Sequence, residues 1–244
     1  MLEYTQSKAN TLSKPFSTID LTSAADSISR KKLRTPKTWV KNNLYSLSVA
    51  AKERILSPTA WLTDDIISAA QQLIQENNPL VGGLQPPCLG QTCSFTIETG
   101  EFIQILHNGA DHWLVVSNTG VSRGSVVRVY DSKYQYLTTS TELQLASLVN
   151  TSEPQIMLQF VDVQKQCGSS DCGVYAVAFA TALSLGQDPG TLHFAESEMR
   201  RHLFNMLKEK KLKMFPVTKK KRSMRVTEGD PILIYCICRM PDVP

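Results

Sequence analysis

The chain has 244 residues, of which 42% are hydrophobic and 20% are charged. This composition suffices for one globular domain with a sizeable core and excludes a chain that is disordered throughout. The six cysteines are too sparse for a secreted disulfide scaffold, and the sequence has neither a signal-peptide pattern nor an apolar run of about 18 residues. We therefore expect an intracellular protein, nuclear or cytoplasmic, that does not enter a membrane.

The formal net charge of +4 hides an uneven distribution. Residues 1–199 carry 14 Lys and Arg against 18 Asp and Glu, whereas residues 200–225 carry 11 Lys and Arg against one Glu. The basic run at 219–222 suits either a solvated linker or a nuclear localisation signal. No aromatic residues interleave this run, so we expect no role in binding nucleic acid.

Four segments differ in composition along the chain. Residues 1–56 are rich in Ser, Thr, Lys and Asn, contain no Gly and have only short apolar stretches. We interpret them as an N-terminal extension that is partly disordered. Residues 57–215 carry the periodic apolar pattern of one domain. Residues 216–230 are a basic linker, and residues 231–244 are a separate tail.

The elements expected within residues 57–215 begin with a helix after Trp61, which is apolar on one face and ends where two Asn precede Pro79. A loop with Gly-Gly and Pro-Pro pairs follows over residues 79–92, and such a loop near a site often gates or binds substrate. Periodicity and turn residues then predict, in chain order, strands at 93–97, 102–106, 113–117 and 125–130, a helix at 142–149, a strand at 156–161, and helices at 173–185 and 194–210.

The strands at 113–117 and 125–130 form a hairpin pattern around a turn-prone Asn-Thr-Gly sequence. If the turn is centred between Val121 and Ser122, residues whose numbers add to 243 lie opposite each other. His112 and Asp131 then become cross-strand neighbours on one face of the sheet. A carboxylate that holds one ring nitrogen of a histidine orients the imidazole as a general base, so this pair is a candidate for that role.

An apolar, Ala-rich segment begins directly after Cys172 and is closed by Gly186, which predicts a buried helix. Cys172 would lie at the N-terminus of this helix, where free N–H groups and the helix dipole favour a thiolate. Gln166 offers an amide donor that, with a backbone N–H near Cys172, can stabilise an oxyanion by roughly 3 kcal/mol per donor. Gly173 allows the backbone to approach a substrate closely. A base, an orienting carboxylate, an amide donor and a thiol indicate a cysteine hydrolase.

Cys167 is the main competitor for the role of nucleophile, because it too is followed by a Gly. It precedes the predicted helix by a full loop and lacks the position at the helix N-terminus that Cys172 has. Two further alternatives are a regulatory disulfide between Cys167 and Cys172 and a pair of unconnected thiols that share a loop.

Several motifs, taken together, resemble those of the ubiquitin-like-protein proteases, the SUMO-specific protease family related to the adenovirus protease. They are Trp61-Leu-Thr-Asp, His112-Trp, Tyr-Asp131-Ser, and Gln166 placed six residues before the Cys172 of Asp-Cys-Gly. The resemblance extends from about residue 57 to residue 215. It implies an α+β, papain-like fold in which a central, mostly antiparallel sheet is flanked by helices and the nucleophile begins a buried helix.

The resemblance also implies roles for individual residues. His112, Asp131 and Cys172 would be the catalytic triad, and Gln166 would be the oxyanion residue. In the family, Trp residues at the positions of Trp61 and Trp113 flank a narrow tunnel that admits a Gly-Gly C-terminus. The sequence departs from the family pattern at Thr63, where the family often has Asn, and at Cys167 beside Gln166.

The tail carries a second, partial resemblance. Cys236 and Cys238 match the first two zinc ligands of a PHD finger, but a structural zinc site needs four ligands, so we expect no metal here. We predict a cysteine peptidase or isopeptidase that cleaves after the C-terminal Gly-Gly of a ubiquitin-like modifier of the SUMO or NEDD8 class, without a cofactor. Two alternatives remain open: a mobile-element protease of the same fold with another substrate, and an inactive module that binds a modifier or a chromatin partner. No pattern indicates an oligomeric state.

Overall fold

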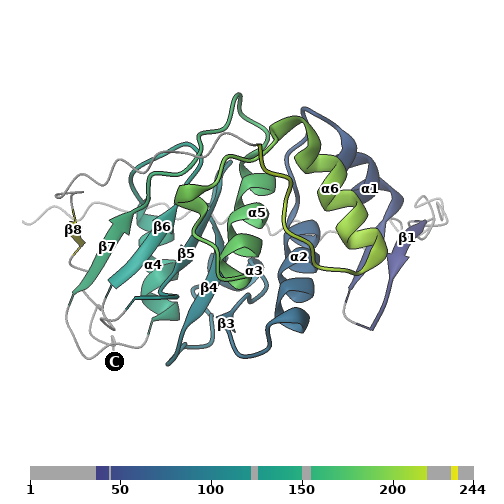
Figure 1. Cartoon of the computed structure of the whole chain (residues 1–244). Helices are drawn as coiled ribbons and strands as arrows, with labels where there is room; N and C mark the ends of the chain where they lie inside the picture. Colours follow the sequence, from purple (N-terminus) through teal and green to yellow (C-terminus); the bar gives the residue numbers. More distant parts are fainter. Residues whose placement is uncertain (1–36, 44, 122–125, 150–154, 219–231, 236–244) are drawn as a thin grey trace, which may run out of the picture. The chain divides into compact units, whose positions relative to one another are not determined.

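The computed structural model describes residues 37–43, 45–121, 126–149 and 155–218, together with the backbone of residues 232–235 (Figure 1). The predicted disorder in the first 36 residues and the PHD-like cysteines lie outside these residues. Among the residues described, no helix is long and apolar enough to cross a membrane.

A six-stranded mixed sheet forms the centre of the structure, with the strands in the order in which they occur in the chain. Two neighbouring pairs, β3–β4 and β6–β7, are parallel, and the other three pairs are antiparallel. The sheet is therefore mostly antiparallel, as the sequence predicts. Its strands are β3 (Gly82–Gly83), β4 (Phe102–His107), β5 (Trp113–Ser117), β6 (Val126–Tyr130), β7 (Ile156–Phe160) and β8 (Ile232–Tyr235).

Helices cover both faces of the sheet. Helix α5 packs against β4 and β5 on one face, beside α2 and α6, whereas α4 packs on the opposite face (Figure 1). The central strand β5 is buried at every position, because both of its faces contact a core. The helices are α1 (Val49–Leu56), α2 (Asp64–Asn77), α3 (Cys88–Gln91), α4 (Thr139–Leu148), α5 (Cys172–Ser184) and α6 (Glu196–Glu209), with a 3-10 turn at Pro189–Thr191.

Helix α5 is the central helix of the larger core. Every residue from Cys172 to Ala182 is buried, which explains why the helix is apolar on all sides. Alanines at four of these positions allow the sheet and the neighbouring helices to approach closely. This packing holds the first residue of the helix near the ends of the central strands β5 and β6, where the candidate site lies.

The folded domain begins earlier than residue 57, so the predicted boundary of the N-terminal extension is wrong. Strands β1 (Thr38–Lys41) and β2 (Ser46–Ser48) form a hairpin, and α1 follows directly. Their apolar side chains, including Leu47 and Ile55, belong to the same core as α5. The prediction failed because these apolar residues are separated by polar ones, and they form a continuous face only after the chain folds back as hairpin and helix.

The predicted strand at 93–97 is absent from the structure. Cys93 has a φ of 49°, in the left-handed region, which interrupts an extended chain. The predicted loop before it contains the short helix α3. At the other end, residues 232–235 pair with β7, so the predicted separate tail begins with a strand of the central sheet.

Candidate active site

His112 and Asp131 lie in contact at the ends of two neighbouring strands. His112 immediately precedes β5 and Asp131 immediately follows β6, and the distance from His112 Nε2 to Asp131 Oδ1 is 2.8 Å. Each side chain is only 2% exposed. The observed register pairs Val115 with Tyr130, so opposed residue numbers add to 245 rather than the predicted 243. A shift of two residues keeps both side chains on the same face, and they meet as diagonal neighbours.

Backbone groups fix the carboxylate of Asp131. Its Oδ1 also accepts hydrogen bonds from the backbone N–H groups of Lys133, at 2.7 Å, and Tyr134, at 2.8 Å. The ring of Tyr134 contacts the His112 imidazole edge-on, with 4.9 Å between the ring centroids. A cavity of about 190 Å³ adjoins this pair. The backbone turn after Asp131 thus orients its carboxylate, and the carboxylate orients the imidazole of His112.

The pKa of His112 is raised above the usual value for histidine. Burial lowers its pKa, but hydrogen bonds to Asp131 and to Cys172, with the negative charges of both groups, outweigh this effect and raise the pKa to about 9. Since Nε2 bonds Asp131, Nδ1 is the ring nitrogen that remains for an interaction with Cys172. The imidazole is therefore bonded to a carboxylate on one side and interacts with Cys172 through the other, as a general base for a thiol requires.

Cys172 is the first residue of α5 and is buried. Its Sγ lies 3.9 Å from the backbone carbonyl oxygen of Asp111. Asp171, which precedes it, makes no side-chain hydrogen bond to the helix end. The free N–H groups of the first turn and the positive end of the helix dipole therefore face the region of the sulfur.

Gln166 is joined to the turn that carries Asp131. Its Oε1 accepts a hydrogen bond from Ser132 Oγ at 2.7 Å, and its backbone N–H donates to the carbonyl of Ser132 at 3.0 Å. Its Nε2 donates to the carbonyl of Gly168 at 2.8 Å, in the loop before Cys172. An amide nitrogen has two hydrogens, so one remains for an oxyanion. Ser132 was part of the sequence motif, but its function as a link to Gln166 was not predicted.

The three residues predicted to bind substrate differ in exposure. Trp61 is 45% exposed, whereas Trp113 is 3% exposed and Gly173 is buried. A Cβ on Gly173 would lie 3.0 Å from Leu62 Cβ and 3.1 Å from Trp113 Cδ1, so this glycine permits close packing of protein against protein. The Nε1 of Trp113 donates to the carbonyl of Leu62 at 3.1 Å. Trp113 and Gly173 thus pack against each other beside Cys172, whereas the indole of Trp61 is exposed.

Cys167 lies in an environment that does not favour a thiolate. It is exposed, and its backbone N–H donates to the carboxylate of Glu196 at 3.1 Å. The negative charge of Glu196 raises the pKa of the Cys167 thiol. Cys167 and Cys172 are both free thiols. Of the two candidates, Cys172 has the environment of a nucleophile.

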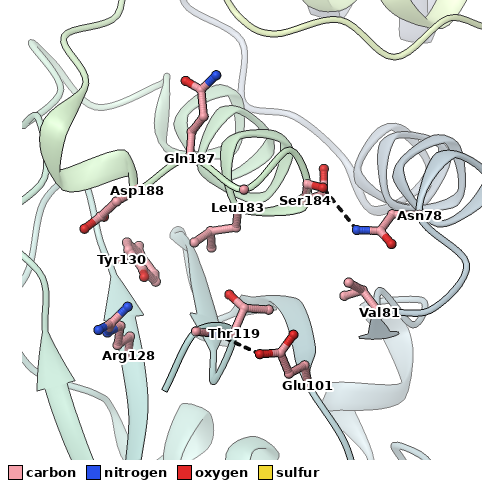
Figure 2. A pocket seen from close by; sticks show the side chains of 12 residues that line it. Asn78, Val81, Glu101, Thr119, Arg128, Tyr130, Leu183, Ser184, Gln187 and Asp188 are labelled. Atoms are coloured by element: carbon pink, nitrogen blue, oxygen red, sulfur yellow. Dashed lines mark hydrogen bonds between the residues drawn. The ribbon is translucent and has the colours of Figure 1, made fainter. Parts of the chain in front are cut away.

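A second cavity, of about 420 Å³, lies at the C-terminal end of α5 (Figure 2). Its lining carries charges of both signs: Arg128 is basic, and Glu101 and Asp188 are acidic (Figure 2). A helix rises 1.5 Å per residue, so Leu183 in this lining is about 17 Å from Cys172. The cavity is therefore separate from the candidate site.

Solved structures share this fold. No protein-family model and no curated protein matches the sequence. The protease domain of yeast Ulp1, solved in complex with Smt3, the yeast SUMO, is 15% identical with a TM-score of 0.55, over 74% of this chain and 90% of that one. Ulp1 with its catalytic cysteine oxidised to a sulfinic acid is also 15% identical, with a TM-score of 0.54, over 75% of this chain and 93% of that one. The chain therefore has the α+β fold of the Ulp1-like SUMO proteases, as its motifs predict.

Proposed function

We propose that the chain is a cysteine peptidase that cleaves after the C-terminal Gly-Gly of a ubiquitin-like modifier, of the SUMO or NEDD8 class. One observation carries this proposal. A buried imidazole, His112, is bonded to the carboxylate of Asp131 at 2.8 Å, and its pKa is raised by Asp131 and by Cys172, the first residue of the central helix of a Ulp1-like fold. This arrangement contains the nucleophile, the base and the orienting group that acyl transfer requires.

In the proposed reaction, the Cys172 thiolate attacks the carbonyl carbon of the terminal glycine. The negative charge that forms on the carbonyl oxygen is stabilised by Gln166 Nε2 and the backbone N–H of Cys172. His112 Nδ1 then gives its proton to the departing amine, which leaves a thioester on the enzyme. A water molecule, deprotonated by His112, hydrolyses the thioester and releases the modifier. Each step uses groups of this chain and requires no metal or organic cofactor.

Trp61 supports the binding of an extended peptide near the site. It lies three residues before α2 and is 45% exposed, so its indole offers an apolar surface across which a Gly-Gly segment can lie.

The cysteines support a reducing compartment, and we propose a nuclear or cytoplasmic location. All four cysteines within the described part of the chain are free. A thiol nucleophile also remains active only where it is not oxidised.

A panel of fluorogenic substrates tests the proposed function. Each substrate joins a coumarin amide to the C-terminus of SUMO, NEDD8 or ubiquitin. We expect the wild type to hydrolyse at least one, Cys172→Ser to hydrolyse none, and Cys167→Ser to behave as the wild type. Hydrolysis that persists in Cys172→Ser, or its absence for all three substrates in the wild type, would contradict the proposal.

A further inference from the structure

Arg200, on α6, uses all of its hydrogen-bond donors to bind oxygens of two chain segments, residues 54–60 and residues 170–171. A guanidinium group has five N–H donors in one plane. Its side chain is 11% exposed, and each nitrogen donates to an oxygen of the protein. The bonds are Nε to Asp171 Oδ1 at 2.7 Å, Nη1 to the carbonyls of Arg54 and Ile55 at 3.2 Å each, and Nη2 to the carbonyls of Ala60 at 2.8 Å and Ser170 at 3.1 Å.

These acceptors belong to two segments that are far apart in the sequence. Residues 170–171 end the loop that leads to Cys172, and residues 54–60 run from the last turn of α1 to Trp61. One further bond joins the two segments, from Ser170 Oγ to the carbonyl of Pro58 at 2.9 Å, and a bond within the second segment runs from Arg54 Nη1 to the carbonyl of Trp61 at 3.2 Å. Arg200 therefore joins the loop of the nucleophile to the segment that carries the exposed indole.

We propose that Arg200 is a positioning residue that fixes the nucleophile loop against the Trp61 segment. This inference rests on the proposed function, because it assigns Arg200 a role in acyl transfer. The backbone N–H of Cys172 is one of the two oxyanion donors, and it belongs to the peptide unit that follows Asp171. If residues 170–171 lose their attachment, this N–H no longer points at the place where the oxyanion forms.

The thiolate itself does not depend on this attachment. His112 precedes β5 and Asp131 follows β6, and none of the five bonds of Arg200 involves either residue. Alkylation by iodoacetamide needs only a reactive thiolate, because it forms no oxyanion. Hydrolysis of an amide needs both the thiolate and the oxyanion donors. Loss of the Arg200 contacts should therefore slow hydrolysis and leave alkylation nearly unchanged.

Arg200→Lys is the variant of choice, because lysine keeps the charge but has three donors on a flexible chain and cannot reach five acceptors in one plane. Arg201→Lys is the matched control: it lies on the same helix and stacks on the ring of Phe204 at 5.7 Å, away from the boundary. Three quantities are measured for each protein: hydrogen exchange in peptides covering residues 56–61 and 168–173, the alkylation rate of Cys172, and kcat on the modifier substrate.

For Arg200→Lys we expect exchange to rise about tenfold in both segments, kcat to fall on the order of 100-fold, and alkylation to stay within about threefold of the wild type. Arg201→Lys should change none of the three. Exchange that rises in only one segment or in neither overturns the inference, as does an equal fall of kcat and alkylation. Asp171→Asn removes only the charge of one acceptor, so it should raise hydrogen exchange and lower kcat by smaller factors than Arg200→Lys does. It replaces Arg200→Lys if that variant does not fold.

The exchange measurement separates this inference from the proposed function, because it needs no substrate. If the wild type hydrolyses none of the modifier substrates, the proposed function fails. Hydrogen exchange in residues 56–61 and 168–173 of Arg200→Lys still shows, without any substrate, whether Arg200 holds the two segments together.

Discussion

Replacing Asp131 by asparagine tests the pair that we propose activates Cys172. The amide oxygen of the new side chain can still accept from the backbone N–H groups of Lys133 and Tyr134, so the turn should keep its shape. The negative charge that stabilises the imidazolium of His112 is lost. The difference between a pKa of about 9 and the usual value of about 6.5 corresponds to about 3 kcal/mol in favour of the imidazolium. Of the groups that raise this pKa, Asp131 contributes most.

Without this charge, the pKa of His112 should fall, because burial lowers it and only Cys172 still raises it. At pH 7.5 a smaller share of the molecules would then carry the imidazolium. Loss of orientation by the carboxylate adds to this effect, so we expect kcat/KM to fall on the order of 100-fold. The assay is a titration of His112 by NMR, together with hydrolysis of the modifier substrate. A pKa that stays near 9 in the variant, or a kcat/KM within threefold of the wild type, would refute the reasoning.

Four other changes have definite expected results. Gly173→Ala forces a Cβ to 3.0 Å from a buried neighbour and should destabilise the fold by about 1–3 kcal/mol, seen as a lower Tm. Gln166→Ala should lower kcat on the order of 100-fold and leave alkylation of Cys172 unchanged. His112 should stabilise the fold fully below about pH 6.5, and this stabilisation should be lost as the pH rises through about 9, because the pKa of His112 is raised in the folded state. The free energies of unfolding of the wild type and of His112→Gln, compared between pH 6 and 10, measure this stabilisation. Deleting residues 1–56 removes core side chains within 37–56 and should prevent cooperative unfolding, measured by calorimetry.

The sequence correctly predicted that His112 and Asp131 lie together, because alternation along a strand determines which face a side chain occupies. His112 and Asp131 therefore lie on one face even though the register differs by two residues from the expected one. The register depends on the conformation of the turn, which the residue types at 118–121 leave open. The position of Cys172 at the start of α5 followed from the length and apolar character of the segment after it.

The surroundings of the site were harder to predict, because they depend on contacts between distant backbone groups. Arg200 bonds four backbone carbonyls, and a carbonyl is the same in every residue type, so no motif marks its partners. Gly173 was expected to give space to a substrate, but that space is used by Leu62 and Trp113, which come from other parts of the chain. Burial of this kind is visible only once the elements are packed.

Covalent capture tests the central claim most directly. SUMO, NEDD8 and ubiquitin with a C-terminal propargylamide are each incubated with the protein, and the adduct is located by peptide mass spectrometry. We expect at least one modifier to attach to the peptide that contains Cys172, and we expect the adduct to be lost in His112→Ala. An adduct on Cys167, or no adduct with any of the three, would contradict the assignment of this chain as a modifier-specific cysteine peptidase.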